Sequence, residues 1–147
     1  MLYYPYNRGM VYQNRVSQET LTDLQTAING EYSAIQCYEQ IANRAPDDMT
    51  RNQIVEIRND EIEHFNDLSK AYTRLTGQQP QAQITEPCPS SYSEDILSAF
   101  KDEQNTVDFY NKASDRSSDL EVKRIFSRAA LDEQQHAVWF LYFLTNR

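Results

Sequence analysis

The sequence predicts an all-α fold, a four-helix bundle with a long crossover between the second and third helices. Only 3 of its 147 residues are glycine and 5 are proline, so little interrupts long helices. Apolar residues recur at alternating steps of three and four along four separate stretches, which is the spacing of one helical face. The length suits a single domain with a substantial core.

The predicted bundle spans residues 17–147, and its helices cover about residues 18–44, 48–76, 93–115 and 118–145. Ser17 is a good N-cap, Ala45-Pro46 ends the first helix, Gly77 ends the second, and the third follows Ser93. The crossover, residues 77–92, carries three of the five prolines. Sixteen extended residues reach ~50 Å, more than the ~37 Å of about 25 helical residues. The third helix can therefore run parallel to the second.

Residues 1–16 hold four tyrosines and show no helical period. We interpret them as an N-terminal arm that packs on the bundle or is disordered, or alternatively as an arm that docks to a larger assembly. They lack the apolar core of a signal peptide, and no apolar stretch reaches the ~18 residues that span a membrane. A net charge of -8 without a basic cluster argues against nucleic acid as a partner.

The two cysteines, Cys37 and Cys88, form no C-x-x-C motif. We expect reduced thiols in a cytoplasmic protein, and a disulfide between them is the less favoured alternative.

Both histidines of the chain end the same kind of segment, and the two segments lie 72 positions apart: Asp60-Glu61-Ile62-Glu63-His64 and Asp132-Glu133-Gln134-Gln135-His136. Two further pairs keep this offset, Glu31 with Glu103 and Tyr38 with Tyr110. The repeat indicates a duplicated helical hairpin that builds one metal site.

The glutamates and histidines of this repeat fall in the middle of otherwise apolar inward faces. Buried carboxylates without partners are costly and repel one another, and no Lys or Arg falls on these faces. Glu-x-x-His places two ligands on one helical face, and such motifs with single glutamates from two other helices characterise di-iron and di-manganese carboxylate bundles. The predicted metal ligands are Glu31, Glu61, His64, Glu103, Glu133 and His136.

On these residues the chain resembles the ferritin-like di-iron carboxylate superfamily over about residues 17–147. It is most similar to rubrerythrin-type and bacterioferritin-type members. The resemblance implies two iron ions per chain, with manganese as the alternative. It also implies that Glu31 and Glu103 are single-helix ligands, that Glu61 and Glu133 bridge the metals, and that each histidine binds one metal.

Two further pairs are expected to support the ligands. Ligating histidines usually donate their second N–H to a carboxylate, and in similar proteins this comes from the opposite hairpin, which pairs Asp60 with His136 and Asp132 with His64. Solvated surface aspartates are the alternative. Tyr38 and Tyr110 lean toward the N-terminus of their helices, so each hydroxyl could bond the glutamate of its own helix, Glu31 or Glu103. Ordinary aromatic core is the equal alternative.

Two departures from rubrerythrins narrow the function. Thr106 stands where rubrerythrins carry an additional glutamate, so the site resembles the six-ligand bacterioferritin type. The chain also lacks paired C-x-x-C motifs of a rubredoxin domain, so electrons would come from a separate donor protein. We predict an oxidoreductase that oxidises Fe(II) or a donor with O2 or peroxide, by peroxide scavenging or as a ferroxidase. Alternatives are iron storage, manganese catalase-like activity, or a structural protein stabilised by metal.

The segment 137–144 is apolar on all sides, which predicts burial on more than one side. We favour a homodimer interface, and cover by the N-terminal arm is the alternative.

Overall fold

The computed structural model describes residues 16–146, and within this range it contains four helices and no strand. These are α1 (Gln18–Arg44), α2 (Asp48–Thr76), α3 (Tyr92–Arg116) and α4 (Leu120–Thr145). The predicted all-α bundle is confirmed, and each helix end lies within two residues of the expected one. The predicted N-terminal arm, residues 1–16, falls outside the described residues apart from Val16. No helix of the described range is long and apolar enough to cross a membrane.

Side-chain caps fix where the helices begin. In each helix the side chain of the preceding residue accepts a hydrogen bond from a backbone N–H of the first turn, and the caps are Ser17, Asp47, Ser91 and Asp119. Helix α3 therefore begins before the predicted Ser93, because Ser91 supplies the cap. Gly77 ends α2 with a left-handed φ of 73°, which a glycine adopts without steric cost.

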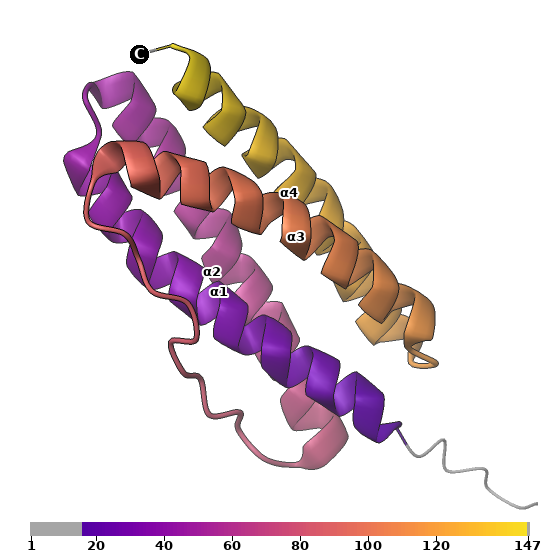
Figure 1. Cartoon of the computed structure of the whole chain (residues 1–147). Helices are drawn as coiled ribbons and strands as arrows, with labels where there is room; N and C mark the ends of the chain where they lie inside the picture. The colour runs from indigo at the N-terminus through magenta and orange to yellow at the C-terminus, as the bar shows by residue number, and fades with distance from the viewer. Residues whose placement is uncertain (1–15, 147) are drawn as a thin grey trace, which may run out of the picture.

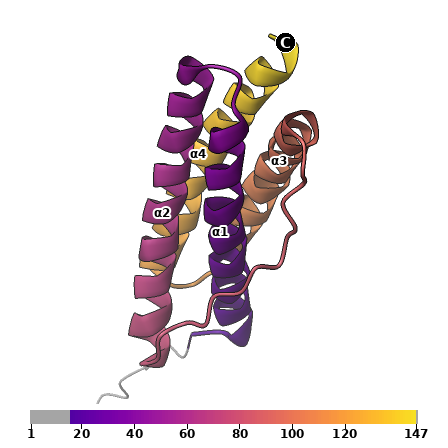
Figure 2. The same cartoon turned by 90° about the vertical axis from the view of Figure 1, so that its left-hand side faces the viewer.

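The helices form two antiparallel hairpins, α1 with α2 and α3 with α4, which pack through α1 against α3 and α2 against α4. The crossover runs the length of the bundle, so α3 is parallel to α2, as predicted (Figures 1 and 2). Two apolar clusters fill the interior: one contains Leu24, Leu68 and Phe126, and the other contains Ile41, Ile54 and Phe140. Along every helix, the repeated glutamates and histidines lie between these clusters.

The crossover lies along one face of α1, held by residues spaced four apart. Gln25 donates to the carbonyl of Gln81, Asn29 accepts from the N–H of Gln83, and Ser33 accepts from the N–H of Thr85. Four helical residues rise about 6 Å, and two extended residues cover about the same length. The matching repeat explains how an extended segment follows the helix without slipping.

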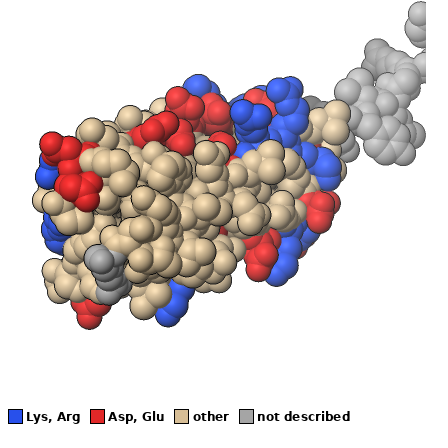
Figure 3. Space-filling view, turned by 90° about the horizontal axis from the view of Figure 1, so that it is seen from above, with Lys and Arg blue, Asp and Glu red and all other residues tan. Residues whose placement is uncertain are grey.

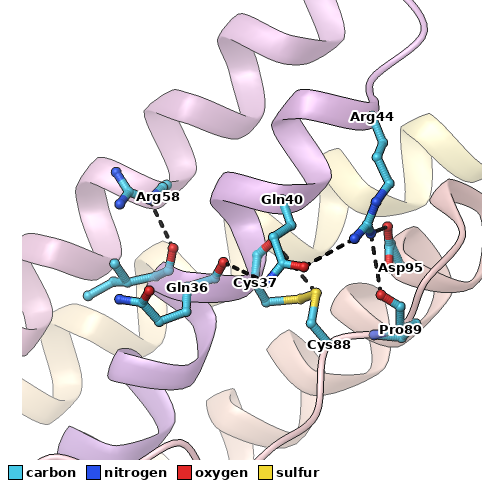
Figure 4. Close-up of a disulfide and its surroundings, with 9 residues drawn as sticks. Gln36, Cys37, Gln40, Arg44, Arg58, Cys88, Pro89 and Asp95 are labelled. Atoms are coloured by element: carbon cyan, nitrogen blue, oxygen red, sulfur yellow. Dashed lines mark hydrogen bonds and ion pairs between the residues drawn. A yellow bond between two sulfur atoms is a disulfide. The ribbon is translucent and has the colours of Figure 1, made fainter.

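The same alignment continues to a disulfide between Cys37 and Cys88 (Figure 4). The expectation of reduced thiols was therefore wrong. Two isolated cysteines say nothing about proximity until the register of the crossover on α1 is known. Arg44, two turns further along α1, holds the residue that follows Cys88: its guanidinium donates to the Pro89 carbonyl at 3.3 Å and also pairs with Asp95. The cytoplasmic location was expected together with reduced thiols, and the disulfide removes that support. The location stays a prediction.

The apolar end of α4 divides between core and surface. Phe140 and Phe143 are buried, whereas Val138 is 61% and Leu141 45% exposed. One face of the molecule shows a broad area without charged side chains (Figure 3). The exposed side chains of Val138 and Leu141 therefore offer an apolar surface for the predicted homodimer. The homodimer itself stays a prediction.

We predict that the disulfide stabilises the fold by constraining the unfolded chain. Closing a loop whose ends are 51 residues apart contributes about 4 kcal/mol in the chain-entropy account. Cys88→Ser should lower the free energy of unfolding by up to this amount in urea titrations. Reductant should destabilise the wild type to the same level and leave Cys88→Ser unchanged. Two titratable thiols in denatured, unreduced wild type would contradict the prediction.

Candidate metal centre

The six predicted ligands meet at the middle of the bundle. Helices α1 and α3 contribute Glu31 and Glu103, whereas α2 and α4 each contribute a Glu-x-x-His pair. All six are buried, with exposed fractions between 1% and 8%. The hairpin symmetry seen in the sequence thus places one glutamate or one Glu-x-x-His pair on each of four helices at one level.

The six side chains form two overlapping groups, each with ligand atoms within 4.8 Å of one another. One group contains Glu31, Glu61, His64 and Glu133, and the other contains Glu61, Glu103, Glu133 and His136. Glu61 and Glu133 belong to both groups, so their carboxylates lie between two sets of donors. This is the placement that two bridged metal ions require.

Each histidine turns its Nδ1 atom toward the carboxylates. His64 Nδ1 lies 3.0 Å from Glu133, 3.3 Å from Glu61 and 3.6 Å from Glu31. His136 Nδ1 lies 3.0 Å from Glu61 and 3.7 Å from both Glu103 and Glu133. The ligand atom that either histidine can offer is therefore Nδ1.

The other ring nitrogen of each histidine contacts an aspartate of the opposite hairpin. His136 Nε2 lies 2.9 Å from Asp60, and His64 Nε2 lies 3.1 Å from Asp132. Both predicted contacts are present, although the aspartate side chains are 43% and 35% exposed and so remain hydrated. An N–H donated from Nε2 leaves the Nδ1 lone pair facing the glutamates.

The two tyrosines bond glutamates, but not those of their own helices. Tyr38 donates to Glu103 at 2.5 Å, and Tyr110 donates to Glu31. The predicted pairing was wrong because the glutamates lean as well. Helical side chains tilt toward their own N-terminus, so Glu31 tilts away from Tyr38 and, since α3 is antiparallel to α1, toward Tyr110. Glu103 and Tyr38 converge in the same way.

Burial and mutual repulsion dominate the electrostatics of the site. Burial raises the pKa of both Glu31 and Glu103, and the negative charges of Glu61 and Glu133 raise it further. Burial opposes ionisation of Glu61 as well, but hydrogen bonds with His136 and His64 lower its pKa below the ordinary value. Without metal, these carboxylates depend on protons and on the histidines for their neutralisation.

The histidines and tyrosines respond to the same cluster. Burial would lower the pKa of His64, but hydrogen bonds to Glu133, Glu31 and Glu61 raise it far above its ordinary value, and His136 behaves alike. Burial and then the charge of Glu103 raise the pKa of Tyr38, which keeps that hydroxyl a donor. Cationic histidines and neutral tyrosines are therefore the metal-free partners of the glutamates.

Among the described residues, several buried atoms of the site have no partner other than the histidine–glutamate contacts of the cluster itself, at 3.0 to 3.7 Å. They are Glu61 Oε1, Glu103 Oε2, Glu133 Oε1 and His136 Nδ1. Unsatisfied buried polar atoms are rare in folded proteins and costly. Their convergence, together with oxygen and imidazole donors that suit iron or manganese, fits a metal site. Thr106 is outside both groups and donates instead to the carbonyl of Asp102.

A cavity of about 110 Å³ between α1 and α3 reaches this cluster. Its lining includes Glu86 from the crossover, Asp102 from α3 and Gly30 from α1, none of which we singled out in the sequence. Gly30 could have been identified from the sequence, because a glycine inside a predicted helix and next to a predicted metal ligand is unusual. The crossover residue could not be found without its register on α1.

The fold and the site together define a ferritin-like four-helix bundle with a buried cluster of carboxylates and histidines. The chain belongs to the rubrerythrin family, whose pattern it matches over residues 23–143. It is 49% identical over 145 residues to the uncharacterized protein YhjR of Bacillus subtilis (strain 168), covering 99% of this chain and 97% of that one.

Solved structures of low identity share the fold. A hypothetical protein from Pyrococcus furiosus superposes with a TM-score of 0.73 at 22% identity, covering 88% of this chain and 89% of that one. A protein from Bacteroides fragilis described as a dodecameric thioferritin, related to bacterioferritin, superposes with a TM-score of 0.78 at 15% identity. That match covers 91% of this chain and 89% of the other.

We predict that the cross-hairpin aspartates tune metal affinity. Asp132→Asn keeps the shape of the side chain but removes the charge that orients His64, so Co²⁺ affinity should fall by about 10–100-fold. Competition titrations followed by Co²⁺ absorption measure this change. Asp67→Asn, an exposed position on α2, removes the same charge and serves as the control. Equal affinities for the two variants would contradict a role for Asp132.

Proposed function

We propose that the chain is a di-iron protein. Glu31 with His64 would hold one ion, Glu103 with His136 would hold the other, and Glu61 and Glu133 would bridge them. The observation that carries the proposal is that two donor groups share the same two glutamates. Two divalent cations would offset four buried carboxylates, which have no lysine or arginine ion pair in the described part of the chain.

The proposed reaction is oxidation of Fe(II), or of a donor, by O2 or peroxide. When bound, a pair of Fe(II) ions would supply one electron each, which matches the two electrons needed to reduce peroxide to water. Because residues 16–146 contain no rubredoxin-like cysteine pairs, we propose that a separate protein donates electrons. Membership in the rubrerythrin family supports this chemistry without selecting the oxidant.

The protein residues would orient and protect the site. Asp60 and Asp132 hold the histidine tautomer, so that Nδ1 offers its lone pair inward. Tyr38 and Tyr110 each donate to one carboxylate oxygen of a single-helix glutamate, which restricts the movement of that carboxylate. The apolar clusters above and below close the site toward the two ends of the bundle, and the cavity between α1 and α3 would be the route for a small oxidant.

Iron storage in a larger assembly is the second candidate, because the thioferritin of similar fold is a dodecamer. The exposed apolar residues of α4, including Leu131, Val138 and Leu141, give this chain a surface for self-association. We propose a homodimer as the smallest unit of such an assembly. Sedimentation velocity distinguishes a dimer from a larger particle, and a monomer at all concentrations would contradict both.

The metal proposal is tested by anaerobic Fe(II) loading and elemental analysis. We expect about two iron ions per chain in the wild type and fewer than about one after Glu61→Ala or His136→Ala, because each change removes a ligand from the shared cluster. Glu63→Ala alters an exposed residue between the two ligands of α2 and should leave the content unchanged. Peroxide consumption with Fe(II) or another reductant should follow the iron content.

A wild type that binds fewer than about one iron per chain would contradict the proposed centre, and so would equal loading of Glu61→Ala and Glu63→Ala. Iron loading without consumption of O2 or peroxide would retain the centre and favour storage over the oxidase reaction.

A further inference from the structure

We propose that the cavity between α1 and α3 is the path by which a hydrated divalent cation reaches the metal centre, with Glu86 and Asp102 as a staging site at its mouth. This inference rests on the proposed metal centre and adds the route to it. It assigns a role to an acidic pair and a helix glycine that the centre itself does not use.

The cavity joins the surface to the site. Its outer lining includes Glu86 and Pro87 of the crossover, both exposed, and its inner lining includes Glu61 and Glu103, which are 1% and 2% exposed. A volume of about 110 Å³ exceeds the ~30 Å³ that one water occupies in the liquid. A metal ion with part of its hydration shell fits such a space.

The staging site is an acidic pair contributed by two elements. Asp102 lies on α3, one residue before Glu103, and Glu86 lies on the crossover. Both residues line the same cavity. Although Glu86 is exposed overall, partial desolvation of its carboxyl raises its pKa, and the negative charge of Asp102 raises it further. Among the described residues, neither carboxyl forms an ion pair with a basic side chain. A cation would relieve this repulsion.

Buried carboxylate oxygens continue the path inward. Glu103 lines the cavity, and the one contact given for its Oε2 atom among the described residues is the ion pair with His136 Nδ1, at 3.7 Å. Asp95, fully buried, also lines the cavity: Arg44 pairs with its Oδ2 atom, whereas Oδ1 is without a partner. The wall that α3 contributes therefore carries three acidic side chains, Asp95, Asp102 and Glu103, and no lysine or arginine.

Gly30 keeps the passage wide. A glycine inside a helix costs about 1 kcal/mol relative to alanine, and Gly30 has no positive φ to require it. A Cβ at this position would meet nothing within 4 Å, so packing does not require a glycine either. Because Gly30 lines the cavity beside Glu31, the missing side chain leaves open space next to the metal centre.

The disulfide fixes the mouth in place. Cys88 follows Glu86 by two residues and is bonded to Cys37, which itself lines the cavity (Figure 4). Arg44 holds the next residue, Pro89, through its carbonyl. The crossover therefore carries Glu86 at a fixed position over the groove between α1 and α3.

The test measures how fast Co²⁺ reaches the centre of the metal-free protein, by stopped-flow absorption, and how much binds at equilibrium. Glu86→Gln with Asp102→Asn should slow loading about tenfold at low salt, because steering by fixed charge is lost, and should leave the bound amount unchanged. The difference in loading rate between this double variant and the wild type should decrease at high salt. Glu56→Gln with Asp108→Asn removes the same charge at exposed positions outside the cavity and should load at the wild-type rate.

A second series of variants alters the width of the cavity instead of its charge. Gly30→Ala and Gly30→Leu should slow loading progressively as the side chain fills the cavity, and circular dichroism checks that both remain helical. Equal loading rates for the two double variants, with normal binding at equilibrium, would overturn the access path alone. A wild type that binds no Co²⁺ at equilibrium would overturn the metal centre and the path with it.

Discussion

The structure depends on four glutamates buried at one level of the bundle. Carboxylates in an apolar interior repel one another and lose their hydration, so they remain there only if positive charge or hydrogen-bond donors meet them. The chain meets this need with two histidines, two tyrosines and, in our proposal, two metal ions. The apolar clusters above and below contribute the hydrophobic stabilisation that the polar site does not.

The same constraint joins the two hairpins. Tyr38 reaches Glu103, Tyr110 reaches Glu31, and each histidine reaches an aspartate of the opposite hairpin. All four contacts cross from one hairpin to the other. The polar network therefore aligns the halves in one register, whereas apolar packing alone would tolerate a shift along the bundle axis. Stability and function share the same residues in this fold.

Much of this arrangement could be predicted from the sequence. The offset of 72 residues between the two Glu-x-x-His motifs identified the cluster, because helical spacing fixes which residues share a face. The tyrosine partners could not be predicted from one helix, because Glu31 and Glu103 tilt in opposite directions along the bundle. The Cys37–Cys88 disulfide and the place of Glu86 required the register of the crossover on α1, which no local pattern encodes.

The central claim is that Glu61 and Glu133 bridge two metal ions. Anomalous X-ray diffraction at the iron absorption edge, from crystals of the iron-loaded protein, tests it most directly. We predict two peaks per chain, one beside Glu31 and His64 and one beside Glu103 and His136, with both shared carboxylates reaching each peak. A single peak, or peaks outside ligand distance of these six side chains, would contradict the account.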